Sequence, residues 1–70
     1  MLVFEVRDDK VHIICDQKGM DTIICALENI RASGDHIHLW SPSYGGCDLE
    51  DRNPWGEPAV KEVVLDWYQE

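Results

Sequence analysis

The chain has 70 residues, of which 14 are Asp or Glu and six are Lys or Arg, so its formal net charge is −8. This balance argues against nucleic-acid binding, which requires a basic surface, and against docking on an anionic membrane. The length corresponds to a single domain, 1–70, and the hydrophobic share of 44% is that of a globular chain rather than a disordered one.

A β-hairpin is predicted at the start of the chain. Apolar and polar residues alternate over 2–7, and a second strand pattern covers 11–15. The polar residues Asp8, Asp9 and Lys10 separate the two segments and suit a tight turn. Because the strongest turn signals, Asn-Gly and Asp-Gly, are absent, the turn type stays open.

An amphipathic helix is predicted next, over about 17–32. Asp16 is a good N-cap residue, and Gly34 is a plausible left-handed C-cap. Gly19 is a weak helix former in the first turn. The apolar stripe that indicates the helix consists of Met20, Ile23, Ile24, Leu27 and Ile30.

The second half of the chain contains two strand patterns and a long connection. The strands are expected over 36–40 and 59–68. The connection, 41–58, is rich in turn residues, and at about 18 residues it is longer than most loops of a compact domain. Loops of this length tend to be functional or disordered, and the presence of Trp55 favours an ordered or binding role.

These elements predict an α+β fold of order ββαββ, with a four-stranded, mostly antiparallel sheet and one helix packed on one face. The strand order is open. The inner face of this sheet is expected to comprise Leu2, Phe4, Val6, Val11, Ile13, Ile37, Leu39, Val63, Leu65 and Trp67. The second face is expected to comprise Val3, Glu5, His12, Ile14, His36, His38, Trp40, Val64, Asp66 and Tyr68. That mixed face could be solvated, pack against a second copy or receive a partner.

His36 and His38 are the weak candidates for a metal site. Alternation on a strand places both rings on the same face, and Cys15, Cys47 or Asp48 could add ligands. No second chelating pair accompanies them, so we expect no metal and no cofactor. A Cys47–His38 nucleophile is formally possible, but nothing activates Cys47, and we expect no enzymatic activity.

The chain is expected to be cytoplasmic. Its three cysteines form an odd set without CxxC spacing, which favours reduced thiols over a disulfide framework. The first residues lack the basic and apolar regions of a signal peptide, and no apolar run approaches the ~20 residues of a membrane span.

The acidic half of the chain is the predicted partner-binding region. Residues 35–70 contain eight acids and two bases, a net charge of −6, and five of the six Phe, Trp and Tyr residues. Carboxylates can steer a basic partner, and Trp and Tyr are common interface anchors, whereas a run of loop carboxylates can also be merely solvated. The predicted contacts are Trp40, Tyr44, Asp48, Glu50, Asp51 and Trp55.

Residues 31–46, with the sequence RASGDHIHLWSPSYGG, followed by Asp48 and Leu49, resemble the immunity protein 32 family of bacterial polymorphic-toxin and contact-dependent inhibition systems. The shared features are a helix ending in Gly-Asp-His-x-His-Leu, a Ser-Pro-x-aromatic-Gly-Gly stretch, an acidic loop and a closing strand. Cys47 departs from the polar residue expected there, and the last strand is less polar than usual in the family.

The resemblance implies a protein that neutralises a cognate toxin by stoichiometric binding in the cytoplasm of the producing cell, without catalysing a reaction. Two alternatives stay open. One is a homodimeric structural or interaction domain whose open sheet faces pack together, because a small core often needs further burial. The other is a metal-binding module built on His36 and His38.

Overall fold

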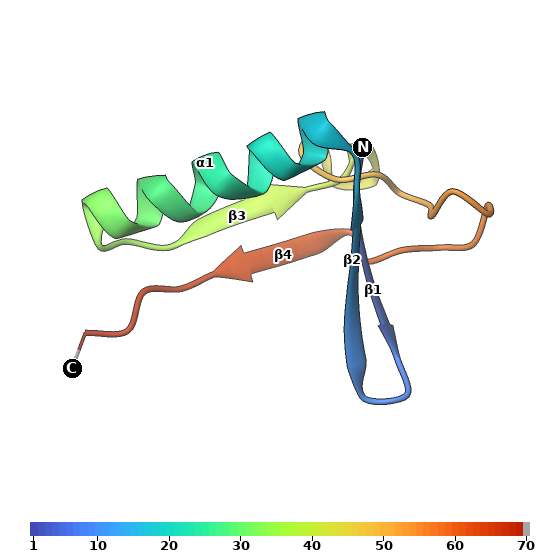
Figure 1. Ribbon diagram of the computed structural model, residues 1–70, viewed down its shortest axis with the longest axis horizontal. Coiled ribbons are helices and arrows are strands. Elements are labelled where there is room, and N and C mark those ends of the chain that lie inside the picture. Colours follow the sequence, from blue (N-terminus) through green and yellow to red (C-terminus); the bar gives the residue numbers. More distant parts are fainter. Residues whose placement is uncertain (70) are drawn as a thin grey trace.

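The computed structural model describes residues 1–69 and has the expected ββαββ order of elements (Figure 1). Strands β1 and β2 form the hairpin, helix α1 follows, and strands β3 and β4 flank the long connection, which begins with the short 3₁₀ helix η1. Their bounds are Leu2–Arg7 for β1, Lys10–Cys15 for β2, Gln17–Ser33 for α1, Ile37–Trp40 for β3, Pro42–Tyr44 for η1 and Glu62–Leu65 for β4.

The hairpin is antiparallel and closes through a two-residue turn. Arg7 pairs with Lys10, so Asp8 and Asp9 are the two central residues, and both have positive φ, 51° and 62°. Two positive φ values define the type I′ turn, whose twist matches that of the flanking strands. Aspartate tolerates this conformation better than most residues because its short polar side chain can bond locally.

The helix begins and ends at the predicted caps. The Asp16 carboxylate accepts a hydrogen bond from the Gly19 backbone N–H at 2.9 Å. It also forms an ion pair with the Met1 ammonium at 2.6 Å. The ammonium and the Gly19 amide hold the pKa of Asp16 below its usual value. Gly34, at φ 69°, donates its N–H to the Ile30 carbonyl, so the helix ends there as predicted.

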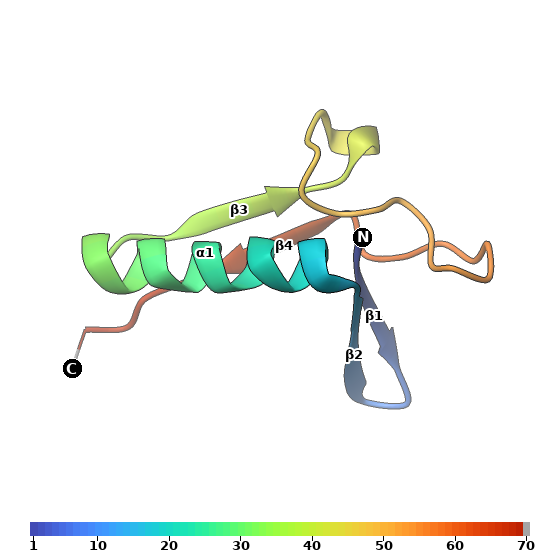
Figure 2. The same cartoon turned by 45° about the horizontal axis from the view of Figure 1, so that its top comes forward.

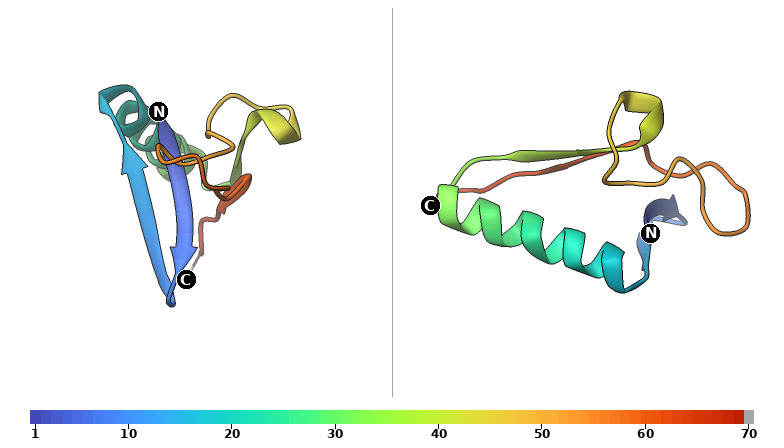
Figure 3. Two further views of the ribbon diagram at one scale, coloured as in Figure 1. Left: turned by 90° about the vertical axis from the view of Figure 1, so that its right-hand side faces the viewer. Right: turned by 90° about the horizontal axis from the view of Figure 1, so that it is seen from above.

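The prediction of one four-stranded sheet is wrong, because the strands form two separate antiparallel pairs, β1–β2 and β3–β4. Figure 3 shows the hairpin standing at a steep angle to α1 and to the second pair. The outer edge of β1 is taken by the long connection. The Glu50 and Val60 backbone N–H groups donate to the Leu2 and Phe4 carbonyls, at 2.9 Å each, which leaves β1 no acceptors at these positions for another strand.

The last strand is also shorter than predicted. It covers Glu62–Leu65 rather than 59–68, because β3 offers only four residues, Ile37–Trp40, as pairing partners. Trp67 therefore lies beyond the ladder.

The core lies where α1, the base of the hairpin and the β3–β4 pair meet. Its buried residues include Leu2, Ala26, Leu39 and Leu49, with the partly buried Phe4 packed against them. The predicted burial of Val6, Val11, Ile13 and Trp67 is wrong, because all four are exposed. The hairpin tip extends past the helix (Figure 1), and Trp67, which follows β4, borders α1 beside Ile24 and Leu27 without being covered.

Two residues assigned to the second face are buried instead. Val3 and Glu5 lie under the connection after β3, which covers that side of β1. No helix within residues 1–69 is both long and apolar enough to cross a bilayer.

Candidate functional site

Backbone hydrogen bonds hold the connection between β3 and β4 to the body of the protein at several points, and two excursions project between them (Figure 2). Its first part folds back on itself: the Tyr44 and Gly46 backbone N–H groups both donate to the Ser41 carbonyl, at 2.9 and 3.0 Å. The Asp48 and Leu49 N–H groups then return to the Trp40 carbonyl, at 3.1 and 3.2 Å. Backbone hydrogen bonds thus fix the first part of the segment against β3.

Two of the predicted contact carboxylates shape this loop. Asp48 accepts a hydrogen bond from the Trp40 backbone N–H at 3.2 Å, and Asp51 accepts one from the Ser43 N–H at 3.1 Å. The pKa of Asp51 is lowered, chiefly by the Ser41 hydroxyl, which faces it without reaching hydrogen-bond geometry, and by Ser43. Both groups are anions that face the loop backbone, and each is half-buried.

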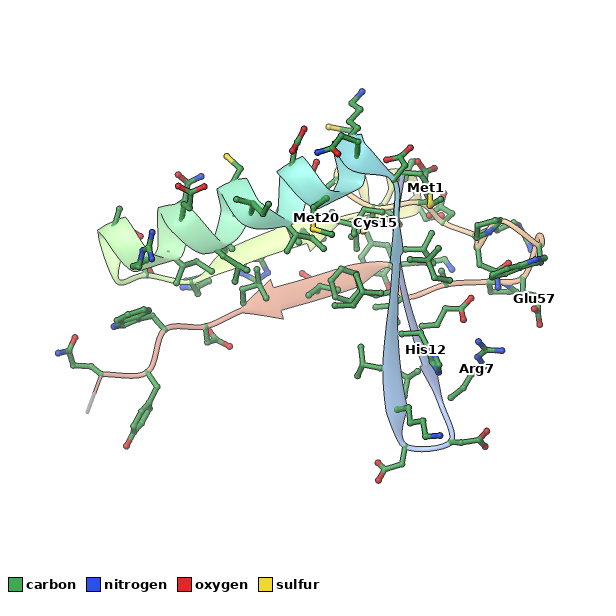
Figure 4. The ribbon with its side chains drawn as sticks, in the orientation of Figure 1. Met1, Arg7, His12, Cys15, Met20 and Glu57 are labelled. Atoms are coloured by element: carbon green, nitrogen blue, oxygen red, sulfur yellow. The ribbon has the colours of Figure 1, made fainter. Side chains whose placement is uncertain are left out.

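Glu50 is exposed, and only its backbone is engaged, with the Leu2 carbonyl. Glu57, which Figure 4 labels on the excursion away from the hairpin, is also exposed, and its carboxylate accepts a long hydrogen bond, 3.5 Å, from the Asn53 side-chain amide. The single base of the segment 41–58, Arg52, donates to the Gly56 carbonyl at 2.8 Å. With four carboxylates and one guanidinium, the segment has a net charge of −3.

Asn53 organises the second part of the loop and is not among the site residues predicted from the sequence. Its side-chain oxygen accepts from the Trp55 and Glu57 backbone N–H groups, at 3.0 and 2.9 Å, while its side-chain amide donates to Glu5. Both Asn53 and Glu5 are buried. The Asn-Pro dipeptide at 53–54 is a turn signal that could have indicated this role, but nothing in the sequence indicates the buried partner in β1.

This anchored turn presents Trp55 to solvent. The Gly56 N–H closes the turn on the Asn53 carbonyl at 3.0 Å, and Gly56 adopts φ 87°, which favours glycine. The Trp55 side chain is 70% exposed, although its own backbone N–H is bonded to a buried residue. Because the backbone that carries the indole is already fixed, burial of the indole in a partner costs little additional conformational entropy of the chain.

Trp40 and Tyr44 differ from Trp55 in how they are held. The Trp40 indole stacks on the His38 ring, with centroids 5.3 Å apart, and donates its N–H to the Glu62 carboxylate at 2.5 Å. Tyr44 ends η1 and is exposed. Of the predicted contacts, Trp40 and Asp48 share a hydrogen bond at the end of β3, whereas Trp55 belongs to the separate turn that Asn53 organises.

His36 and His38 share one face of the chain, with ring centroids 5.1 Å apart, as the alternation predicted. Each Nδ1 faces a carboxylate: Asp35 at 2.9 Å and Glu62 at 3.0 Å. The His36 backbone N–H, which donates to Asp35 at 2.8 Å, and then the His36 ring lower the pKa of Asp35. The Trp40 indole and then the His38 ring lower the pKa of Glu62. No group of three potential metal ligands occurs in the part of the chain that the structure describes, so Cys15, Cys47 and Asp48 do not complete a site.

Comparison of the chain with protein-family models, with curated proteins and with solved structures finds no match.

Proposed function

We propose that this chain is a small acidic binding protein whose loop 41–58 contacts a basic protein, and that the partner is a toxin neutralised by stoichiometric binding. The exposure of Trp55 on an anchored turn is the observation that carries the proposal. The resemblance of residues 31–49 to the immunity protein 32 family supplies the expectation that the partner is a toxin.

The chemistry of the loop supports a protein partner. Large aromatic side chains that enter a pocket dominate the energy of many interfaces, while surrounding charges set the association rate and exclude wrong partners. Trp55 and Tyr44 supply the aromatic groups, and Glu50 and Glu57 supply exposed anions around them. A basic partner is therefore expected to dock on the loop with Trp55 as the anchor.

The mode of action follows from the size of the chain. A domain of 8.1 kDa can cover one functional surface of a partner, and no chemistry of its own is required for that. Occlusion predicts a one-to-one complex whose affinity falls as ionic strength rises, because salt screens attraction between exposed charges.

The direct test is co-expression with each protein encoded beside the gene that arrests growth when expressed alone, with growth as the readout. The unaltered chain should restore growth and form a one-to-one complex with the purified toxin at low salt. The Trp55→Ala variant should lose rescue, with affinity lowered by roughly 30-fold or more, the effect of truncating an interface hot spot.

Tyr68→Ala is the matched control, because it removes an aromatic side chain that is 83% exposed and lies outside the loop. This variant should rescue growth fully. The proposal is refuted if the unaltered chain neither rescues growth nor forms a complex. The role of Trp55 is refuted if Trp55→Ala and Tyr68→Ala lose rescue equally.

A further inference from the structure

The hairpin exposes an apolar face near its tip. The pairs Val6–Val11 and Phe4–Ile13 put four apolar side chains on the same side of the two strands. Near the tip the other side is polar, and Figure 4 shows Arg7 and His12 projecting from it. Phe4 is partly buried in the core, but Val6 and Val11 are each 64% exposed and Ile13 is also exposed. Strand pairs in water usually hide such a face.

Helix α1 exposes a second apolar stripe that adjoins the first. Met20, Ile24 and Leu27 recur at i, i+4 and i+7, and all three are exposed. In Figure 4 Met20 lies next to Cys15 in the angle between α1 and β2, so the helical stripe starts where the hairpin face ends. We call the combined surface the hairpin–helix face; its members are Val6, Val11, Ile13, Met20, Ile24 and Leu27.

The molecule as a whole exposes more surface than a monomer of its mass is expected to expose. The accessible surface is 5132 Å², whereas a monomer of 8.1 kDa is expected to expose about 4,500 Å². The radius of gyration, 12.4 Å, likewise exceeds the value of about 11 Å expected for this length. The projecting hairpin and the chain after β4 account for this open shape (Figure 1).

A second copy of the chain is a partner of the right size to cover this excess accessible surface. If each of two copies buried its excess of about 600 Å², the interface would total about 1,200 Å², the lower limit of a standard stable interface. A two-fold dimer uses the same patch on both copies, and a chain with two arms at a steep angle can place its hairpin in the angle of its partner. The core is small, so the extra burial would add to its stability.

We infer that the chain forms a homodimer through the hairpin–helix face, with the hairpin of each copy packed against α1 of the other. The Trp55 turn lies on the other side of the hairpin, where Asn53 contacts Glu5, so this surface leaves that turn free for the proposed toxin. The inference thus goes beyond the proposed function and does not depend on it.

Charge gives the dimer a distinctive salt dependence. Each copy carries −8, so bringing two together is opposed by repulsion, and added salt should strengthen the dimer. The proposed complex with a basic toxin should respond in the opposite way. The two associations are therefore distinguishable in a single salt titration.

The experiment measures the solution mass of the full chain by sedimentation, with a reductant present because Cys25 and Cys47 are free, exposed thiols. The mass should rise from 8.1 kDa toward twice that value between about 5 and 200 µM, and the dissociation constant should fall between about 50 and 500 mM NaCl. A mass of 8.1 kDa throughout this range would overturn the inference.

Three variants, one of them a control, test the position of the interface. Leu27→Glu places a carboxylate on the helical stripe and should weaken dimerisation at least about tenfold. Asn29→Glu adds the same charge at an exposed position on another side of the same helix and should not. Val11→Thr keeps a strand-forming residue and should also weaken the dimer.

Circular dichroism of each variant at low concentration verifies that it is folded. If a dimer forms but Leu27→Glu and Asn29→Glu affect it equally, the interface lies elsewhere and the inference is wrong. Growth rescue by Trp55→Ala and Tyr68→Ala is scored separately, so failure of either proposal leaves the other open to its own test.

Discussion

The side-chain amide of Asn53 donates a hydrogen bond to the buried carboxylate of Glu5, 48 positions earlier in the chain. Through this bond the loop that carries Trp55 is attached to β1. The Arg7 guanidinium lies 3.2 Å from the other Glu5 oxygen as an ion pair, although it makes no hydrogen bond to it.

Asn53→Ala should therefore destabilise the protein by roughly 1–3 kcal/mol, because it leaves the Glu5 carboxylate buried without its amide donor. Thermal unfolding measures the loss. Glu50→Ala, which removes an exposed carboxylate from the same loop, is the control and should change stability little. Equal melting temperatures for Asn53→Ala and the unaltered chain would contradict the assigned role of the Asn53–Glu5 bond.

Gly19 lies in the first turn of α1, where sequence reasoning identifies it only as a weak helix former. Replacing an interior helical glycine by alanine normally stabilises a helix by about 0.5–1 kcal/mol. Here a Cβ would meet the Met1 carbonyl, whose carbon lies 2.8 Å away, and the Cys15 Cβ at 2.9 Å. Since the obstacle includes backbone, Gly19→Ala should cost roughly 1–3 kcal/mol of unfolding free energy.

Denaturant unfolding of Gly19→Ala and of Asn29→Ala tests whether alanine destabilises the helix at position 19 instead of stabilising it. Asn29 is exposed in the same helix, so its replacement by alanine should be neutral or slightly stabilising. A gain of stability in both variants would show that the chain start does not pack on Gly19.

Glu62 should contribute to the loss of stability in acid. The Trp40 indole and then His38 lower its pKa from the ordinary value of 4.5. A carboxyl whose pKa is lower when folded stabilises the protein above its unfolded pKa, and this contribution is lost as pH falls through the folded pKa. Glu62→Gln should therefore flatten the decline in unfolding free energy below about pH 4.5.

The measurement is denaturant unfolding from neutral to acid pH, followed by Trp fluorescence. Part of the acid decline should persist in Glu62→Gln, because Asp16, Asp35 and Asp51 also have lowered pKa values. An unchanged acid slope in the variant would show that the Trp40–Glu62 contact does not form in solution.

The conformation of the Asp8–Asp9 turn predicts the order of stability of three variants at position 9. Asp9 has φ 62°, a conformation that glycine adopts freely, aspartate with some strain and alanine with more. Asp9→Gly should therefore stabilise the hairpin, by about 0.5–1 kcal/mol, and Asp9→Ala should destabilise it. Melting temperatures should fall in the order Gly, Asp, Ala, and any order with Ala above Asp would exclude the type I′ turn.

Local signals in the sequence were sufficient for most elements. Alternation predicted the hairpin, and the Asp16 and Gly34 caps predicted both ends of α1, because these features depend on neighbouring residues. Alternation also placed His36 and His38 together. The roles of Asn53 and Glu5 could not be predicted in this way, since their contact joins residues far apart in the chain.

The sequence by itself determined the order of elements, the helix with its caps, the acidic character of the second half and the location of Trp55 in a turn-rich segment. Tertiary structure decided that the strands form two pairs, because backbone groups at Glu50 and Val60 occupy the edge of β1. It also decided which apolar residues stay exposed. Alternation assigns Val6 and Val11 to a face, but only the packing of the whole chain shows that no other element within residues 1–69 covers that face.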